Sequence, residues 1–158
     1  MRYDRFEQLP AWNAAIELAV GTYKLTGERA FIKQRSLRDQ LERAAVSVSN
    51  NIAEGFERGT TQELLTFLYI ARGSAGEVRS MLCLLERLPA FGNFKFEISN
   101  LKSLAEAVSR QLRGWADSLQ NTSIKGTRYL TDKVRRIENA KKGRDELLRE
   151  LQRVQVKQ

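Results

Sequence analysis

The spacing of apolar residues between positions 64 and 85 constrains the fold most. Small and branched apolar residues recur there at alternating steps of four and three, at Leu64, Leu68, Ala71, Ala75, Val78, Leu82 and Leu85. Such steps place one apolar stripe along a helix and are typical of left-handed antiparallel packing in a bundle. Strict alternation over strand lengths is absent, and the 158 residues include only two prolines. The chain is therefore expected to be all-α.

Three other stretches also predict amphipathic helices. The first runs from about Pro10, a residue suited to a first helical position, to position 25. The second starts near Ser36, a good N-cap, and is expected to end at Gly55. Residues 60–63 have the spacing of a capping box, which predicts the start of the helix that contains 64–85, and Pro89 predicts its end. The last helix is expected to cover about 95–119. The apolar faces of these three helices are expected to carry Trp12, Ile16, Ala19, Val20 and Tyr23; Leu37, Leu41, Ala44, Ala45, Val48 and Ile52; and Ile98, Leu101, Ala105, Val108, Leu112 and Trp115.

Short connections between four such helices predict an up-down-up-down four-helix bundle over residues 1–120. Phe91, Phe94 and Phe96 precede the last helix, and we expect them to cap the end of the bundle rather than enter a subunit contact. A polar stretch at 120–126 marks a domain boundary, and residues 121–158 form a basic extension predicted to be helical from about 127 to 154. This additional helix would pack on the bundle, pair with another subunit or project into solvent.

The positive charge is concentrated in this extension. The chain has 27 Lys and Arg against 19 Asp and Glu, a net charge of +8, of which residues 121–158 hold +6. A basic arm attracts polyanions by releasing their counterions. The alternative is a solubilising helix whose charges only contact water. The predicted phosphate-contacting residues of the arm are Lys125, Arg128, Lys133, Arg135, Arg136, Lys141, Lys142 and Arg144. Arg35 and Arg38, at the start of the second helix, form a second tier.

The composition disfavours most enzyme classes. The chain has no His and a single Cys, which removes the commonest general base, His-activated nucleophiles and His-based dimetal centres. Cys83 lies beside the apolar seam and is expected to act as a small hydrophobe. We therefore expect no catalytic site, no metal and no cofactor. Neither a membrane-spanning run nor a secretion signal is recognisable, so a cytoplasmic location without membrane association is expected.

Polar residues inside the second helix predict a buried polar layer. Ser and Asn are mildly unfavourable within helices because they compete for backbone hydrogen bonds. If the second and third helices fold back about residues 57–60, Arg72 comes close to Ala44, Ala45 or Ser47, which allows a polar layer of Arg72, Ser47 and Asn51. We expect these three residues to form a structural layer that fixes the register of the helices.

The same segments carry a family resemblance. The informative strings are Asn51-Ile52-Ala53-Glu54-Gly55 and Tyr69-Ile70-Ala71-Arg72-Gly73-Ser74, within similarity that spans most of residues 6–88. The sequence resembles the bacterial four helix bundle protein family, also called the 23S rRNA intervening-sequence or S23 family, some members of which are encoded inside insertions in 23S rRNA genes. The resemblance implies a bundle that assembles as a ring-like homopentamer without established catalytic activity. Ser49 and Asn50 stand where the family often has Pro and Ser, which implies a softer kink in the second helix.

The family fold is also similar to that of the accessory variability protein of diversity-generating retroelements, a basic pentamer that works with a reverse transcriptase and binds nucleic acid. We therefore expect a non-enzymatic homopentamer that binds nucleic acid, with RNA favoured over DNA, as an accessory to an rRNA insertion or to a reverse transcriptase. The alternative is a protein-interaction scaffold whose C-terminal helix braces the oligomer or docks a partner.

Overall fold

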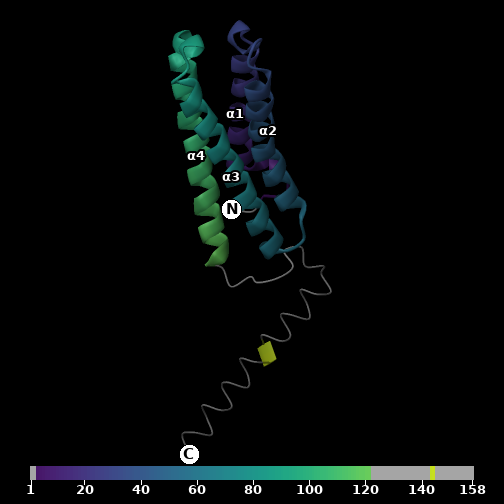
Figure 1. Ribbon diagram of the computed structural model, residues 1–158. Helices are drawn as coiled ribbons and strands as arrows, with labels where there is room; N and C mark the ends of the chain where they lie inside the picture. Colours follow the sequence, from purple (N-terminus) through teal and green to yellow (C-terminus); the bar gives the residue numbers. More distant parts are fainter. Residues whose placement is uncertain (1–2, 122–142, 145–158) are drawn as a thin grey trace, which may run out of the picture. The chain divides into compact units, whose positions relative to one another are not determined.

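The computed structural model describes residues 3–121 and 143–144. Its four long helices are α1 (Pro10–Thr26), α2 (Arg35–Glu57), α3 (Thr61–Leu85) and α4 (Lys95–Gln120). Three short 3-10 helices, η1 (Phe6–Gln8), η2 (Arg29–Phe31) and η3 (Pro89–Phe94), occupy the segments before α1, α2 and α4. Successive helices run in alternating directions, and the described residues contain no strand (Figure 1). The prediction of an all-α four-helix bundle is confirmed.

The chain divides into two units, Met1–Gly126 and Thr127–Gln158, and the bundle belongs to the first. In the predicted C-terminal helix only residues 143 and 144 are described, and both are helical and exposed. The rest of that helix lies outside the described residues.

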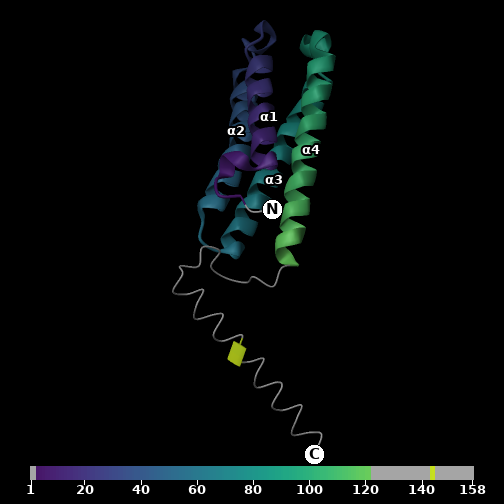
Figure 2. The same cartoon turned by 180° about the vertical axis from the view of Figure 1, so that it is seen from behind.

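Each helix of the bundle packs against two others. The neighbouring pairs are α1–α2, α2–α3, α3–α4 and α1–α4, so that α1 lies diagonally opposite α3. Seen from behind, α1 and α4 form the near side of the bundle (Figure 2). All seven residues of the predicted seam between 64 and 85 are fully buried in α3, as expected.

The face that α1 turns to the core differs from the predicted one. Its buried residues are Ala11, Ala15, Leu18, Ala19, Thr22, Leu25 and Thr26. Of the predicted stripe only Ala19 is buried, whereas Val20 and Tyr23 expose 49% and 50% of their surface. The reason is that α1 is apolar on two sides, so periodicity alone did not indicate which side meets the bundle.

Helix α2 starts near Ser36 as expected, but neither Ser36 nor Gly55 has the predicted capping role. The helix begins at Arg35 and its N-cap is Gln34, which makes no side-chain hydrogen bond to the helix start. At the other end α2 continues through Gly55 to Glu57. Gly55 serves close packing instead of termination, since a Cβ built there would lie 2.7 Å from Cβ of Phe67 in α3.

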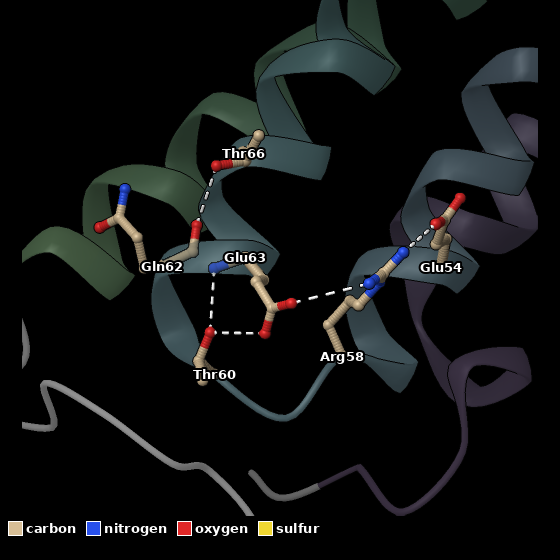
Figure 3. Close-up of polar contacts among 6 residues, drawn as sticks. All are labelled: Glu54, Arg58, Thr60, Gln62, Glu63 and Thr66. Carbon is tan, nitrogen blue, oxygen red and sulfur yellow. Dashed lines mark hydrogen bonds and ion pairs between the residues drawn. The ribbon is translucent and has the colours of Figure 1, made fainter.

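The predicted start of α3 is confirmed. Thr60 is the N-cap, and its Oγ1 accepts a 3.2 Å hydrogen bond from the backbone N–H of Glu63 (Figure 3). The hydroxyl of Thr60 in turn donates to Oε2 of Glu63 at 2.7 Å. This arrangement satisfies one of the N–H groups that a helix start leaves without a partner.

Candidate nucleic-acid interface

Four cationic residues lie where α1 leads into α2. They are Arg29, Lys33, Arg35 and Arg38, and no Asp or Glu occurs between positions 29 and 38. All four residues are exposed. This basic turn, residues 29–38, lies at the same end of the bundle as the turn between α3 and α4 (Figure 1).

A buried aromatic pair holds the basic turn in place. Phe31, at the end of η2, is 1% exposed, and its ring centroid lies 4.7 Å from that of Phe91 in η3. Backbone hydrogen bonds from Ile32 to Arg29 and from Gln34 to Phe31 close successive turns around it. Because Phe31 points into the core, the long cationic side chains on either side of it point toward solvent.

Most of the positive charge of the basic turn has no acidic partner. Nε of Arg38 donates to Oε1 of Glu42 at 2.9 Å. Arg29, Lys33 and Arg35 make no ion pair with any residue that the structure describes. The first turn of α2 contains no acidic residue, and its N-cap makes no side-chain hydrogen bond. The free N–H groups of this helix start add to the positive potential and are suited to anions such as phosphate.

The turn between α2 and α3 has the opposite electrostatic character. Positions 54–63 contain three Glu and one cation, Arg58. Arg58 lies 2.6 Å from Glu54 and 3.7 Å from Glu63 (Figure 3). The hydrogen bond to Glu54 is the main reason that the pKa of Arg58 is raised above its usual value. Since two carboxylates neutralise this cation, this turn is a poor binding surface for phosphate.

Two of the three residues predicted for the polar layer, Ser47 and Asn51, are hydrogen-bonded to each other. Nδ2 of Asn51 donates to the carbonyl oxygen of Ser47 at 2.7 Å and contacts its Oγ at 3.0 Å. The partner in α3 is Ser74, whose Oγ lies 2.9 Å from Oγ of Ser47. Arg72 makes no hydrogen bond or ion pair with a described residue. The turn between α2 and α3 covers residues 58–60, and it places Ser74 rather than Arg72 opposite Ser47.

Of the predicted phosphate-contacting residues, the structure describes Arg35, Arg38 and Arg144. Arg35 and Arg38 belong to the basic turn, and Arg144 is helical and exposed. Sequence reasoning missed Arg29 and Lys33, although four cations within ten residues without one acid were a readable signal. The remaining candidates lie outside the described residues, namely Lys125, Arg128, Lys133, Arg135, Arg136, Lys141 and Lys142.

The part of the chain that the structure describes offers little other chemistry. It contains no group of three or more Cys, Asp or Glu side chains placed to hold a metal ion. Within the same residues, no helix is both long and apolar enough to cross a bilayer. Cys83 is half-buried on α3.

Comparisons with known proteins agree with the fold. One similar crystal structure is that of a protein of unknown function from the S23 ribosomal protein family of Bacteroides thetaiotaomicron VPI-5482. The TM-score is 0.60 at 18% identity, and the match covers 67% of this chain and 97% of that one. No curated protein sequence matches the chain. The sequence profile of the 23S rRNA-intervening sequence proteins matches residues 7–114, and the chain therefore belongs to the family of 23S rRNA-intervening sequence proteins.

Proposed function

We propose that the protein is a non-enzymatic homo-oligomer, a pentamer by family resemblance, that binds nucleic acid through basic surface. The observation that carries this proposal is the basic turn, where Arg29, Lys33 and Arg35 surround an uncapped helix start and make no ion pair with a described residue. The C-terminal excess of +6 in residues 121–158 adds a second source of positive charge. Self-association repeats both sources in every copy, which raises the local concentration of a polyanion.

RNA is favoured over DNA as the ligand because the family is described by its link to intervening sequences of 23S rRNA. The contacts proposed here go to phosphates, so they position the protein without reading the base sequence. A role as accessory to an rRNA insertion or to a reverse transcriptase is consistent with such binding. Neither role requires chemistry from the bundle itself.

The test is a binding titration of the full chain with a labelled single-stranded RNA and a DNA of the same sequence, at several salt concentrations. The logarithm of the binding constant should fall linearly with the logarithm of salt concentration, and the RNA should bind more tightly. The double variant Lys33→Gln/Arg35→Gln should reduce the slope by about 1.4, at about 0.7 per lost phosphate contact. Neutralising Lys141, Lys142 and Arg144 should also flatten the slope if the extension contributes.

The matched control is Arg110→Gln/Arg113→Gln, which removes the same charge from α4. These two residues are exposed but pair with Glu106 at 2.8 Å and Asp117 at 3.7 Å. The control should leave the slope unchanged. If the control flattens the slope as much as Lys33→Gln/Arg35→Gln does, net charge alone matters and the basic turn has no special role. A slope near zero for the unmodified chain would exclude nucleic-acid binding and favour the scaffold function.

A further inference from the structure

Helix α1 has a second apolar face that points away from the core. Ile16, Val20 and Tyr23 follow one another at steps of four and three, a spacing that lines them up along the helix. Together with Ala19 and Lys24 they line a shallow surface groove of about 460 Å³. A helix that is apolar on two sides is typical of one with a packing partner on each side. The bundle supplies a partner for one side only.

The outward side of α3 is flat where the outward side of α1 protrudes. Gly73 and Gly76 lie in the middle of α3, and a Cβ built at either position would meet no atom within 4 Å. Packing inside the bundle therefore does not require glycine at these positions, although glycine weakens a helix. Ile70 and Leu84 lie on the same side of α3 and each expose 47% of their surface. The outward side of α3 therefore carries two glycines together with Ile70 and Leu84, and the exposed Glu77 lies midway between these two apolar residues.

The other two helices have polar outward faces. The exposed residues of α2 and α4 are mostly charged or polar and include Gln40, Arg43, Asn50, Glu54, Ser103, Glu106, Arg110 and Asp117. Phe96, in the first turn of α4, is the exception at 74% exposure. The exposed large apolar side chains of the helices are therefore concentrated on α1 and α3, which lie on a diagonal of the bundle.

We infer that the Ile16–Val20–Tyr23 face of α1 packs onto the Gly73–Gly76 face of α3 in a second copy of this chain. Large side chains on one helix and glycine on the other allow the two backbones to approach closely, as in other contacts built on small residues. Lys24 borders the α1 face and the exposed Glu77 lies between Ile70 and Leu84 on the α3 face, so the two faces carry opposite charges. Both halves of the contact are present on one chain, which favours a second copy over an unrelated partner.

The position of the two faces determines the type of assembly. Because they are different and lie on opposite sides of the bundle, the contact is heterologous, and each copy offers both faces. Helices α1 and α3 run in the same direction, so α1 of one copy lies parallel to α3 of the next (Figure 1). Such head-to-tail contacts close into a ring, or form a filament if the rotation does not close. This inference rests on the homo-oligomeric part of the proposed function and is independent of nucleic-acid binding.

Cross-linking of full-length chains tests the contact directly. In a Cys83→Ser background, one protein carries Val20→Cys and a second, larger through a terminal tag, carries Ser80→Cys. Ser80 is exposed on α3, one turn beyond Gly76. Mild oxidation of the mixture without nucleic acid should give the mixed disulfide-linked pair, and either protein alone should give little product. Mixing the Val20→Cys protein with a Ser103→Cys protein, which places the thiol on the polar face of α4, should give none.

Bulky substitutions on the glycine face provide a second test. Gly73→Leu and Gly76→Leu should each cause loss of the oligomer in light scattering while the circular dichroism remains helical. Gly114→Leu is the matched control, because Gly114 is also exposed in a helix and a Cβ there meets no atom within 4 Å. That control should retain the oligomer.

The outcomes separate this inference from the proposed function. If the unmodified chain is an oligomer but Val20 and Ser80 do not cross-link, or only like thiols cross-link, the inference is overturned and self-association stands. If the unmodified chain is a monomer at every concentration, both the inference and the homo-oligomeric part of the proposed function fail. RNA binding by the monomer would then still support the basic turn.

Discussion

The rings of Phe31 and Phe91 lie with their centroids 4.7 Å apart and their planes tilted by 58°. Both side chains are 1% exposed, so this contact fastens the turn before α2 to the turn before α4 inside the core. We expect Phe91→Ala to lower the free energy of unfolding by about 3–5 kcal/mol, because it removes buried apolar surface and leaves a cavity. Urea denaturation followed by circular dichroism measures this change.

Phe96→Ala is the control for that substitution. Phe96 is only five residues further along the chain but is 74% exposed, so its removal should change the free energy of unfolding by no more than about 0.5 kcal/mol. Equal losses for Phe91→Ala and Phe96→Ala would contradict the assignment of Phe91 as the residue that caps the core.

The N-cap of α3 leads to a second prediction. Thr60→Ala removes the acceptor of the 3.2 Å bond from the backbone N–H of Glu63 and should destabilise the protein by about 1 kcal/mol. Thr66→Ala is a matched change in the same helix, where the hydroxyl only donates to the carbonyl oxygen of Gln62 at 3.0 Å (Figure 3). Chemical denaturation should show no comparable loss for Thr66→Ala. A larger loss for Thr66→Ala than for Thr60→Ala would exclude the capping role.

The ion pair between Glu86, the C-cap of α3, and Lys102 in α4 predicts a dependence of stability on alkaline pH. Nζ of Lys102 lies 2.6 Å from Oε2 of Glu86, and this hydrogen bond is the main cause that raises the pKa of Lys102 above its ordinary value of 10.5. A raised pKa in the folded state means that the stabilisation is complete below pH 10.5 and is lost as the pH rises through the folded-state value. The denaturation midpoints of the unmodified chain and of Lys102→Gln should therefore differ at neutral pH and converge in strong alkali. A difference that stays constant across this range would argue against the pair.

The helices were predictable because local apolar spacing determines them. The α3 seam was predicted in full, since its stripe is narrow and the opposite side of the helix carries glycines and polar residues. The core face of α1 was not, because Leu18 on one side and Val20 on the other are equally apolar. Only contact with the bundle distinguishes the two sides, and that contact is not encoded in the spacing.

The candidate site was predictable in part for a related reason. Arg35 and Arg38 stood at a predicted helix start, whereas Arg29 and Lys33 lie in a turn whose direction depends on the distant contact of Phe31 with Phe91. The polar layer shows the same limit. Helix α2 continues two residues beyond Gly55, its predicted end, and Ser74 lies where Arg72 was expected.

Substitution of glycine by alanine should have opposite effects on the free energy of unfolding at Gly55 and at Gly114. At Gly55 a new Cβ would lie 2.7 Å from Cβ of Phe67 and 3.2 Å from Cδ1 of Leu64, so Gly55→Ala must push α2 and α3 apart. We expect it to lower the free energy of unfolding by about 1–3 kcal/mol, the usual cost of overpacking. At Gly114 no atom lies within 4 Å of the new Cβ, so Gly114→Ala should raise the free energy of unfolding by about 0.5–1 kcal/mol through better helix propensity. Urea denaturation of the two variants should therefore show shifts of opposite sign. A stabilising Gly55→Ala would mean that the helices are further apart at this point than the contact with Phe67 requires.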